Sequence, residues 1–131
     1  MPADDAAAQP FAYAVVRVVP SAQRGERLNA GVVLFCRTHD FLDLRTKLDP
    51  ERLGALAPQL DPEPVRSRLQ ALRLVVRGDP AAGALAALEP SERFGWLVAP
   101  SSTIIQASEV HTGMTTDPGA TLERLFAELV A

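Results

Sequence analysis

The sequence predicts an α+β domain: an antiparallel meander of three strands and a fourth, later strand form one sheet, with helices packed on at least one face. Two observations carry this prediction. The first part of the 131-residue chain contains β-rich runs separated by short polar loops, and the later part contains apolar residues at helical spacing behind Asp-Pro pairs. Strands that precede grouped helices are typical of α+β folds.

The central element is a hairpin of two strands, residues 11–19 and 28–36. Both alternating sets of side chains in each run are largely apolar, and Arg17 is the exception in the first run, so we expect the hairpin to be covered on both faces. Pro20 ends the first strand because it has no N–H to donate. Gly31, inside the second strand, indicates a bulge or the close approach of another backbone or a ligand.

A third strand and two helices follow. Residues 41–46 alternate as the last strand of the meander. Two Asp-Pro-Glu sequences then open helices, a short one stopped by Pro58 and a longer one over residues 62–77 that Gly78 ends. The longer helix carries an apolar stripe at helical spacing, formed by Val65, Leu69, Leu72 and Val76.

Residues 79–100 are expected to hold a short helix and a segment anchored in the core. Asp79 and Pro80 open the helix, which runs to Leu88 and is interrupted by Gly83. In the segment that follows, Ser91 is the expected helix cap. Three apolar side chains are expected to press into the core: Phe94, Trp96 and Leu97.

The chain ends with a strand and a helix. Residues 102–110 have the β-branched content of the fourth strand, and residues 111–113 follow it. Asp117 caps a last helix that ends near Val130. Because the helices of residues 50–88 lie between the third and fourth strands, this connection must cross over the sheet.

Length and composition indicate one domain, residues 11–131, behind a mobile tail of residues 1–10. The net charge of −3 and the pI near 5.3 argue against a general nucleic-acid binder, although a local basic patch stays open. Cys36 is the single cysteine, which excludes an intramolecular disulfide and fits a reducing compartment. The start of the chain has no basic and apolar leader, and the apolar runs are too short for a membrane span, so we expect a soluble cytoplasmic protein.

Motifs of several enzyme classes are missing from the sequence. It contains no Walker loop, GxGxxG, CxxC, HExxH or GxSxG pattern. Its two histidines, His39 and His111, lie far apart in the sequence, so we predict no metal site and no cofactor. An enzyme of this sequence would have to assemble its site from carboxylates and one histidine.

The best candidate site is a polar cluster near the hairpin loop. Its members are Arg17, Arg24, Glu26, Asn29 and His111, with Ser101 and Ser102 as further candidates. Arg17 lies on a strand covered on both faces and needs a partner, for which Glu26 is the nearest candidate. We favour a structural ion pair that holds the loop; the alternative is an anion-binding or acid–base site with His111 as the titrating group.

A second candidate is a basic stripe on the helix of residues 62–77. Arg66, Arg73 and Arg77 are separated by steps of seven and four residues, which return to nearly the same helical angle. A solvated face is the more common role of such a stripe, and the alternative is a surface that faces an anion, in an acidic partner or a phosphate backbone.

Four segments carry a family resemblance: RGERLNAGVVLF at residues 24–35, ERFGWL at 92–97, PSST at 100–103 and HTG at 111–113. With them the chain resembles, over nearly all of residues 11–130, the bacterial domain of unknown function numbered 3037. The resemblance implies a small stand-alone bacterial protein, often encoded beside a HipA-like kinase, and thus a toxin–antitoxin-type or accessory partnership. It implies no catalytic residues.

Two hypotheses of function follow. The first, which we favour, is a non-enzymatic accessory or interaction protein that binds a partner protein, for which the HipA-like kinase is the candidate. The second is a small enzyme or an anion- or phosphate-binding domain that acts through Arg17, Arg24, Glu26 and His111.

Overall fold

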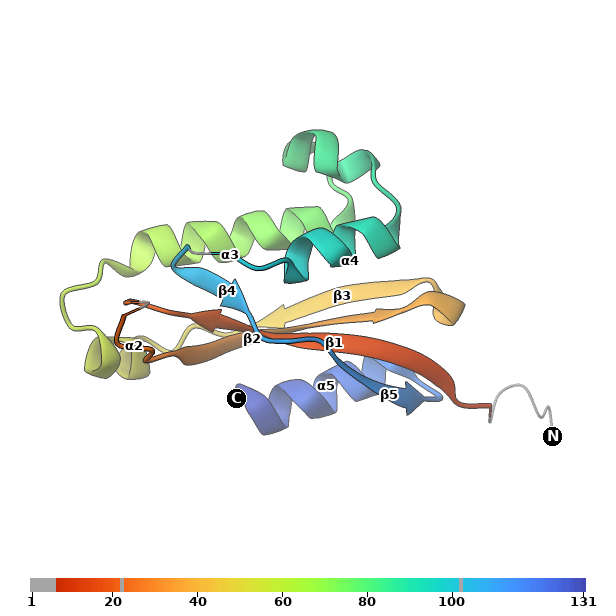
Figure 1. Ribbon diagram of the computed structural model, residues 1–131, viewed down its shortest axis with the longest axis horizontal. Coiled ribbons are helices and arrows are strands. Elements are labelled where there is room, and N and C mark those ends of the chain that lie inside the picture. The colour runs from red at the N-terminus through yellow and green to blue at the C-terminus, as the bar shows by residue number, and fades with distance from the viewer. Residues whose placement is uncertain (1–6, 22, 102) are drawn as a thin grey trace.

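The computed structural model describes residues 7–21, 23–101 and 103–131. In these residues an antiparallel sheet carries helices on both faces, which confirms the α+β prediction (Figure 1). The strands are β1 (Gln9–Val18), β2 (Leu28–Cys36), β3 (Phe41–Thr46), β4 (Ile105–Ala107) and β5 (His111–Thr115). The helices are η1 (Arg37–His39), α2 (Pro50–Leu56), α3 (Pro62–Arg77), η2 (Pro80–Ala87), α4 (Pro90–Val98) and α5 (Pro118–Leu129), of which η1 and η2 are 3-10 helices.

The β1–β2 hairpin lies at the centre of the sheet, whose strand order is β3-β2-β1-β4. The other edge of β1, opposite β2, is shared by two later strands. β5 pairs with residues 9–13 of β1, and β4 pairs with residues 16–18. A bulge between Val16 and Arg17 shifts the register against β2. The connection from β3 to β4 therefore crosses the sheet, as predicted.

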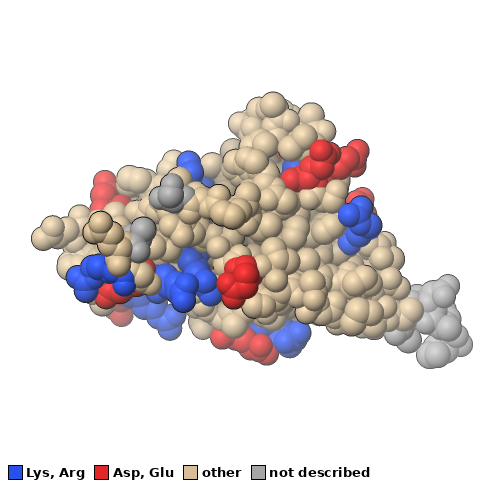
Figure 2. Space-filling model, viewed as in Figure 1, with Lys and Arg blue, Asp and Glu red and all other residues tan. Residues whose placement is uncertain are grey.

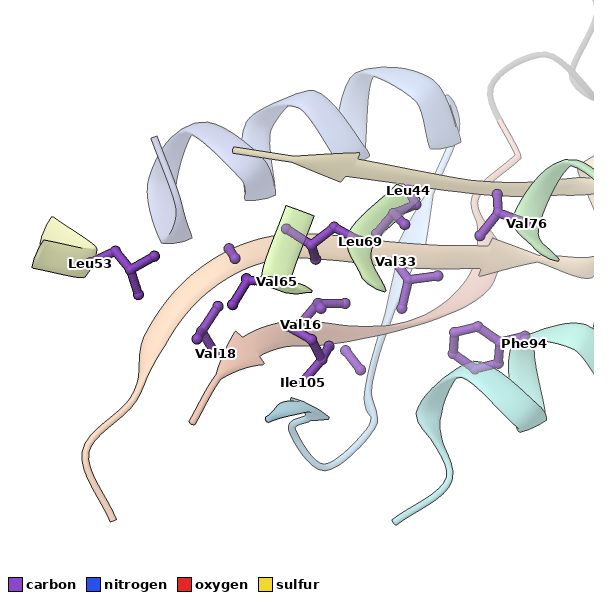
Figure 3. Packing of buried hydrophobic residues seen from close by; sticks show 12 residues of the cluster. Val16, Val18, Val33, Leu44, Leu53, Val65, Leu69, Val76, Phe94 and Ile105 are labelled. Carbon is purple, nitrogen blue, oxygen red and sulfur yellow. The ribbon is translucent and has the colours of Figure 1, made fainter. Parts of the chain in front are cut away.

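Two hydrophobic clusters, one on each face of the sheet, explain why the hairpin is apolar on both sides. Val33 and Leu34 are adjacent in β2, yet both are buried, Val33 in the cluster under α3 and α4 and Leu34 in the cluster over α5. Figure 3 shows the first cluster, in which Val65 and Leu69 of α3 meet Val16 and Val33 of the sheet. In the second cluster, α5 packs on β2 and β3, and its Leu122 and Leu125 are buried together with Leu34 of β2 and Phe11 of β1.

Aspartate side chains cap the helices at the predicted Asp-Pro pairs. In each case a carboxylate oxygen accepts a backbone N–H of the first turn, which satisfies a donor that the helix leaves open. The caps are Asp49, Asp61, Asp79 and Asp117. Gly78 ends α3 at a φ of 64°, a conformation that glycine adopts at low cost. Within the described part of the chain, no helix combines the length and the apolar character that a membrane span requires.

Two boundaries near the ends of the sheet differ from prediction. Residues 1–6 of the expected mobile tail lie outside the described residues, but Gln9 and Pro10 belong to β1 and pair with Thr115 and Met114 of β5. The helix cap expected at Ser91 is wrong, because α4 begins at Pro90 and a reciprocal capping box joins the flanking glutamates, Glu89 and Glu92.

In place of the single strand expected over residues 102–110, the structure has the short β4 within this range and a further strand, β5, that begins at His111, directly after it. Ser102 lies outside the described residues. The break occurs at Ser108, whose hydroxyl accepts the N–H of Val15 at 2.9 Å while its own N–H donates to the Val15 carbonyl at 2.8 Å. A side-chain oxygen thus replaces the carbonyl of a continuous ladder, and residues 108–110 link two strands on the same edge of β1.

We predict that Gly31→Ala destabilises the fold. A Cβ at this position would lie 2.8 Å from the carbonyl oxygen of Arg45 and 3.1 Å from Cγ2 of Thr46, so the backbone of β3 would have to move. Overpacking of this kind costs about 1–3 kcal/mol of unfolding free energy, which urea denaturation measures.

Gly54→Ala is the matched control, because Gly54 lies in α2 and a Cβ there would meet no atom within 4 Å. We expect it to stabilise the protein by about 0.5–1 kcal/mol. Equal unfolding free energies for the two variants would contradict the close approach of β2 and β3.

Candidate functional site

The structure pairs the residues of the predicted polar cluster differently from the prediction. Nε of Arg24 lies 2.9 Å from Oε1 of Glu26, and both side chains are exposed on the hairpin loop. The predicted pairing of Arg17 with Glu26 is therefore wrong. Glu26 pairs with Arg24, two residues away on the same loop. The neighbours of Arg17 in β1, Val16 and Val18, face α3. Because successive side chains of a strand point to opposite faces, Arg17 lies on the sheet face that α5 covers.

Asn29, opposite Arg17 in the β1–β2 register, serves the packing of α5. Its Nδ2 donates to the carbonyl oxygen of Leu129 at 2.9 Å, which satisfies an acceptor at the C-terminal end of the helix. Nε of Arg17 is buried and has no hydrogen-bond partner among the described residues. Asn29 thus ties β2 to α5 instead of completing a reactive site.

Arg17 and His111 lie near a common carboxylate, that of Glu109. Nε2 of His111 is 3.6 Å from Oε1 of Glu109, and the imidazole lies 5.3 Å from the ring of Tyr13 on β1. A backbone hydrogen bond within residue 109 lowers the pKa of Glu109, and the charge of His111 lowers it further, with smaller contributions from Arg17 and Arg27. The side chains of Glu109 and His111 are both exposed, and an ion pair at such a surface contributes little to stability.

Glu109 was missing from the sequence-based cluster, although one signal marks it. It is the only Asp, Glu, Lys or Arg residue in residues 94–116, in a chain with 13 basic and 16 acidic residues. Ser101, a further candidate, lies elsewhere: its hydroxyl is 2.9 Å from that of Thr103 in the loop before β4. The basic stripe of α3 lies beside β3, where Arg73 donates to the hydroxyl of Thr46.

The large hydrophobic side chains that are exposed gather on one part of the chain. Among the described residues these are Trp96 on α4, Val110 before β5 and Met114 on β5, which are 47%, 42% and 63% exposed. The prediction that Trp96 presses into the core is wrong. Phe94 fills that role, since it is 8% exposed and stacks on Phe35 with 5.6 Å between ring centroids, and a helix turns a side chain two positions on to the other side.

These side chains belong to a surface with almost no charge. Residues 94–116 supply α4 from Phe94 onward, β4 and β5, and Glu109 is their one charged residue. Figure 2 shows the result: the surface over α4 and the β4–β5 edge is largely uncharged, and acidic and basic groups gather around its borders. We call this surface, formed by the exposed side chains of residues 94–101 and 103–116, the β4–β5 face.

A hollow of about 230 Å³ opens on the β4–β5 face between α3, α4 and β4. We call it the Trp96 pocket. Most of its wall is apolar, contributed by Val16, Leu72, Trp96, Leu97, Ala99, Pro100, Ile105 and Ala107. A few polar side chains also line it: Arg68, Ser101, Thr103 and Gln106. Apolar walls with a few polar groups are typical of pockets that receive a ligand or a partner's side chain.

The outer edges of β4 and β5 add backbone groups to this face. Each of the two strands pairs with β1 on one side, and no described strand pairs with its other side. Unpaired N–H and C=O groups along an edge can pair with a strand of another chain. The β4–β5 face therefore offers apolar side chains, a pocket and hydrogen-bonding groups together.

Comparison with protein families gives one result. The profile of DUF3037, a protein of unknown function, matches residues 13–130, nearly the whole chain. The chain belongs to the DUF3037 family. Comparisons of this DUF3037 protein with curated proteins and with solved structures find no match. Among its described residues, no group of three or more His, Cys, Asp or Glu side chains is arranged to hold a metal ion.

We predict that Phe94→Ala destabilises the DUF3037 protein far more than Trp96→Ala. Phe94 is buried in the α3–α4 cluster, so its removal costs about 3–5 kcal/mol of unfolding free energy. Trp96 is about half exposed, so its removal costs about 1 kcal/mol. Urea denaturation of both variants measures this, and a larger loss for Trp96→Ala would place that side chain in the core.

We also predict that His111→Gln raises the pKa of Glu109 part-way towards its ordinary value, because the variant removes a nearby positive charge and keeps the backbone hydrogen bond. Because the folded-state pKa of Glu109 is lowered, its contribution to stability is present above the unfolded-state pKa and is lost as the pH falls through the folded-state pKa. Carboxyl NMR titration measures the shift. Arg24→Gln, which removes a cation paired with Glu26, is the control and should leave the pKa of Glu109 unchanged.

Proposed function

We propose that this DUF3037 protein is a non-enzymatic interaction protein that binds a partner protein through its β4–β5 face. One observation carries the proposal: the exposed large hydrophobic side chains of the described residues all lie in one stretch of the chain, residues 94–116, whose 23 residues include one charged side chain. Exposed apolar surface of this kind, bordered by polar groups, marks interaction sites.

The residue types on the face support binding to a protein. Interface centres are depleted of Asp, Glu and Lys and enriched in aromatic residues and Met. Trp96 and Met114 are exposed here, and Met adapts its shape to an apolar partner. The Trp96 pocket can receive an apolar side chain of the partner, and buried anchors in such pockets supply most of the binding energy of many interfaces.

The open edge of β5 supports the same function in a second way. A partner segment in extended conformation can add to the sheet beside β5, where its backbone would pair with the free edge. β5 is five residues long and carries no Asp, Glu, Lys or Arg residue to repel an added strand.

Catalysis by the predicted polar cluster has less support. Arg24 and Glu26 pair with each other on the exposed hairpin loop, while Arg17 and His111 lie near Glu109. Arg17, Arg24 and His111 line neither the Trp96 pocket nor the two hollows between α3 and β3. An acid–base enzyme holds its catalytic groups around a common pocket.

The partner that we propose is the HipA-like kinase expected from the family resemblance, with the DUF3037 protein as its accessory in a toxin–antitoxin-type pair in the bacterial cytoplasm. An accessory role fits a protein whose recognisable surface is a docking face. The proposal names a single pair of proteins, so it can be tested directly.

We predict that the purified DUF3037 protein binds this kinase with at least micromolar affinity and that Trp96→Ala and Met114→Ser each weaken binding by about tenfold, as loss of an interface anchor does. Isothermal titration calorimetry measures the affinities. Arg124→Ala is the control, because Arg124 is exposed on α5, on the other side of the sheet from the Trp96 pocket, and we expect it to bind like the wild type.

Circular dichroism of each variant checks that the fold is intact. Absence of a complex at micromolar concentrations would refute the kinase as partner. Binding that both face variants leave unchanged would refute the β4–β5 face as the docking surface.

A further inference from the structure

A groove with a basic lining runs between α3 and β3, the strand at the end of the sheet opposite to β4. It consists of two adjoining hollows of about 220 and 270 Å³. Both are lined by Thr46 of β3 and Arg73 of α3, so they meet at these two residues. We call them together the α3–β3 groove.

Cations dominate the lining of the groove. The larger hollow is lined by Lys47, Arg66 and Arg73 and by no Asp or Glu residue. The smaller hollow adds Arg77 and Arg45 beside Arg73, with Asp43 as its one acidic residue. Five of the 13 basic residues of a chain with net charge −3 thus line one groove.

The carboxylates near the groove leave much of this charge free. Asp43 accepts the backbone N–H of Leu44 at 2.8 Å, and Glu123 of α5 pairs with Arg45. Glu63 lies 3.9 Å from Arg66, at the limit of an ion pair, and both side chains are exposed. Among the described residues, no carboxylate pairs with the remaining three cations: Lys47, Arg73 and Arg77.

One cation is held in position before any ligand binds. Arg73 donates a hydrogen bond from Nη2 to the hydroxyl of Thr46, so its guanidinium is fixed over the edge of β3 where the two hollows meet. A guanidinium held in this way loses less conformational freedom on binding an anion, and its planar fork can donate to two oxygens at once.

At the edge of β3, one of the backbone donors that an added strand would use is already bonded. The N–H of Lys47 donates to the carbonyl of Ala30, so by alternation Leu44 and Thr46 direct their backbone groups away from β2. The outward N–H of Leu44 is bound by its neighbour Asp43. We therefore expect a ligand in the groove to be bound by the basic side chains that line it and not by pairing with the backbone of β3.

We propose that the α3–β3 groove is a binding site for a ligand with two neighbouring phosphate groups, one in each hollow and both contacted by Arg73. A guanidinium group can donate two parallel hydrogen bonds to the oxygens of a phosphate group. Because Arg73 lines both hollows, it can contact both phosphate groups of a diphosphate. No aromatic side chain lines either hollow, so the site recognises the diphosphate and not a stacked ring. This site is separate from the β4–β5 face and does not depend on the partner proposed above.

Isothermal titration calorimetry of the protein with inorganic pyrophosphate tests the proposal. We expect saturable binding that weakens as NaCl is added, and we expect Arg66→Gln and Arg77→Gln each to weaken it by about tenfold, since each removes a charged donor. Arg68→Gln is the matched control: the same change on the same helix, at a residue that lines the Trp96 pocket on another side of α3. It should bind pyrophosphate like the wild type.

A glutamate-rich peptide in the same assay separates the two classes of anion. We expect the peptide to bind more weakly than pyrophosphate. Stronger binding of the peptide would refute the proposal that the groove binds a diphosphate. No binding of either at millimolar concentrations would show that the arginines only protect the edge of β3. An equal loss of binding in Arg68→Gln would show that pyrophosphate responds to the total charge of the protein and not to the groove.

Discussion

Burial of the β1–β2 hairpin on both faces is the constraint on which the rest of the structure depends. Val33 and Leu34 point to opposite sides of the sheet and are both inaccessible to water, so each side needs its own cover. The long segment between β3 and β4 supplies α3 and α4 for one side, and the C-terminal segment supplies α5 for the other. Helices from two separate parts of the chain therefore cover the two faces of the hairpin.

With the hairpin at the centre, β3 forms one edge of the sheet and β4 and β5 form the other, and the two edges have opposite chemistry. The β3 edge is lined by arginine and lysine side chains, and Asp43 occupies one of its backbone donors. The β4–β5 edge is almost uncharged and adjoins exposed Trp96 and Met114. An open strand edge beside an apolar surface is a hazard in solution, and the partner that we propose would cover it.

Elements whose signals are local could be predicted well from the sequence. Asp61 and Pro62 predict the start of α3, because a carboxylate accepts nearby N–H groups and proline fits the first helical position. Neither effect depends on residues far away in the chain. β4 and β5 were predicted poorly. Their separation depends on Ser108, whose hydroxyl bonds a residue 93 positions away, and a β-branched composition carries no information about that contact.

The sequence by itself determined the family, the α+β class, the helix starts at the Asp-Pro pairs and the stretch of residues 94–116 in which charge is nearly absent. The tertiary structure decided which side chains meet. In the folded protein Glu26 pairs with Arg24, and Glu109 lies beside His111. Trp96 is exposed, and arginines of α3 lie along β3. The physical reason is that helix caps and strand alternation arise within a few residues, whereas ion pairs, pockets and exposure depend on how segments far apart in the chain are packed and registered.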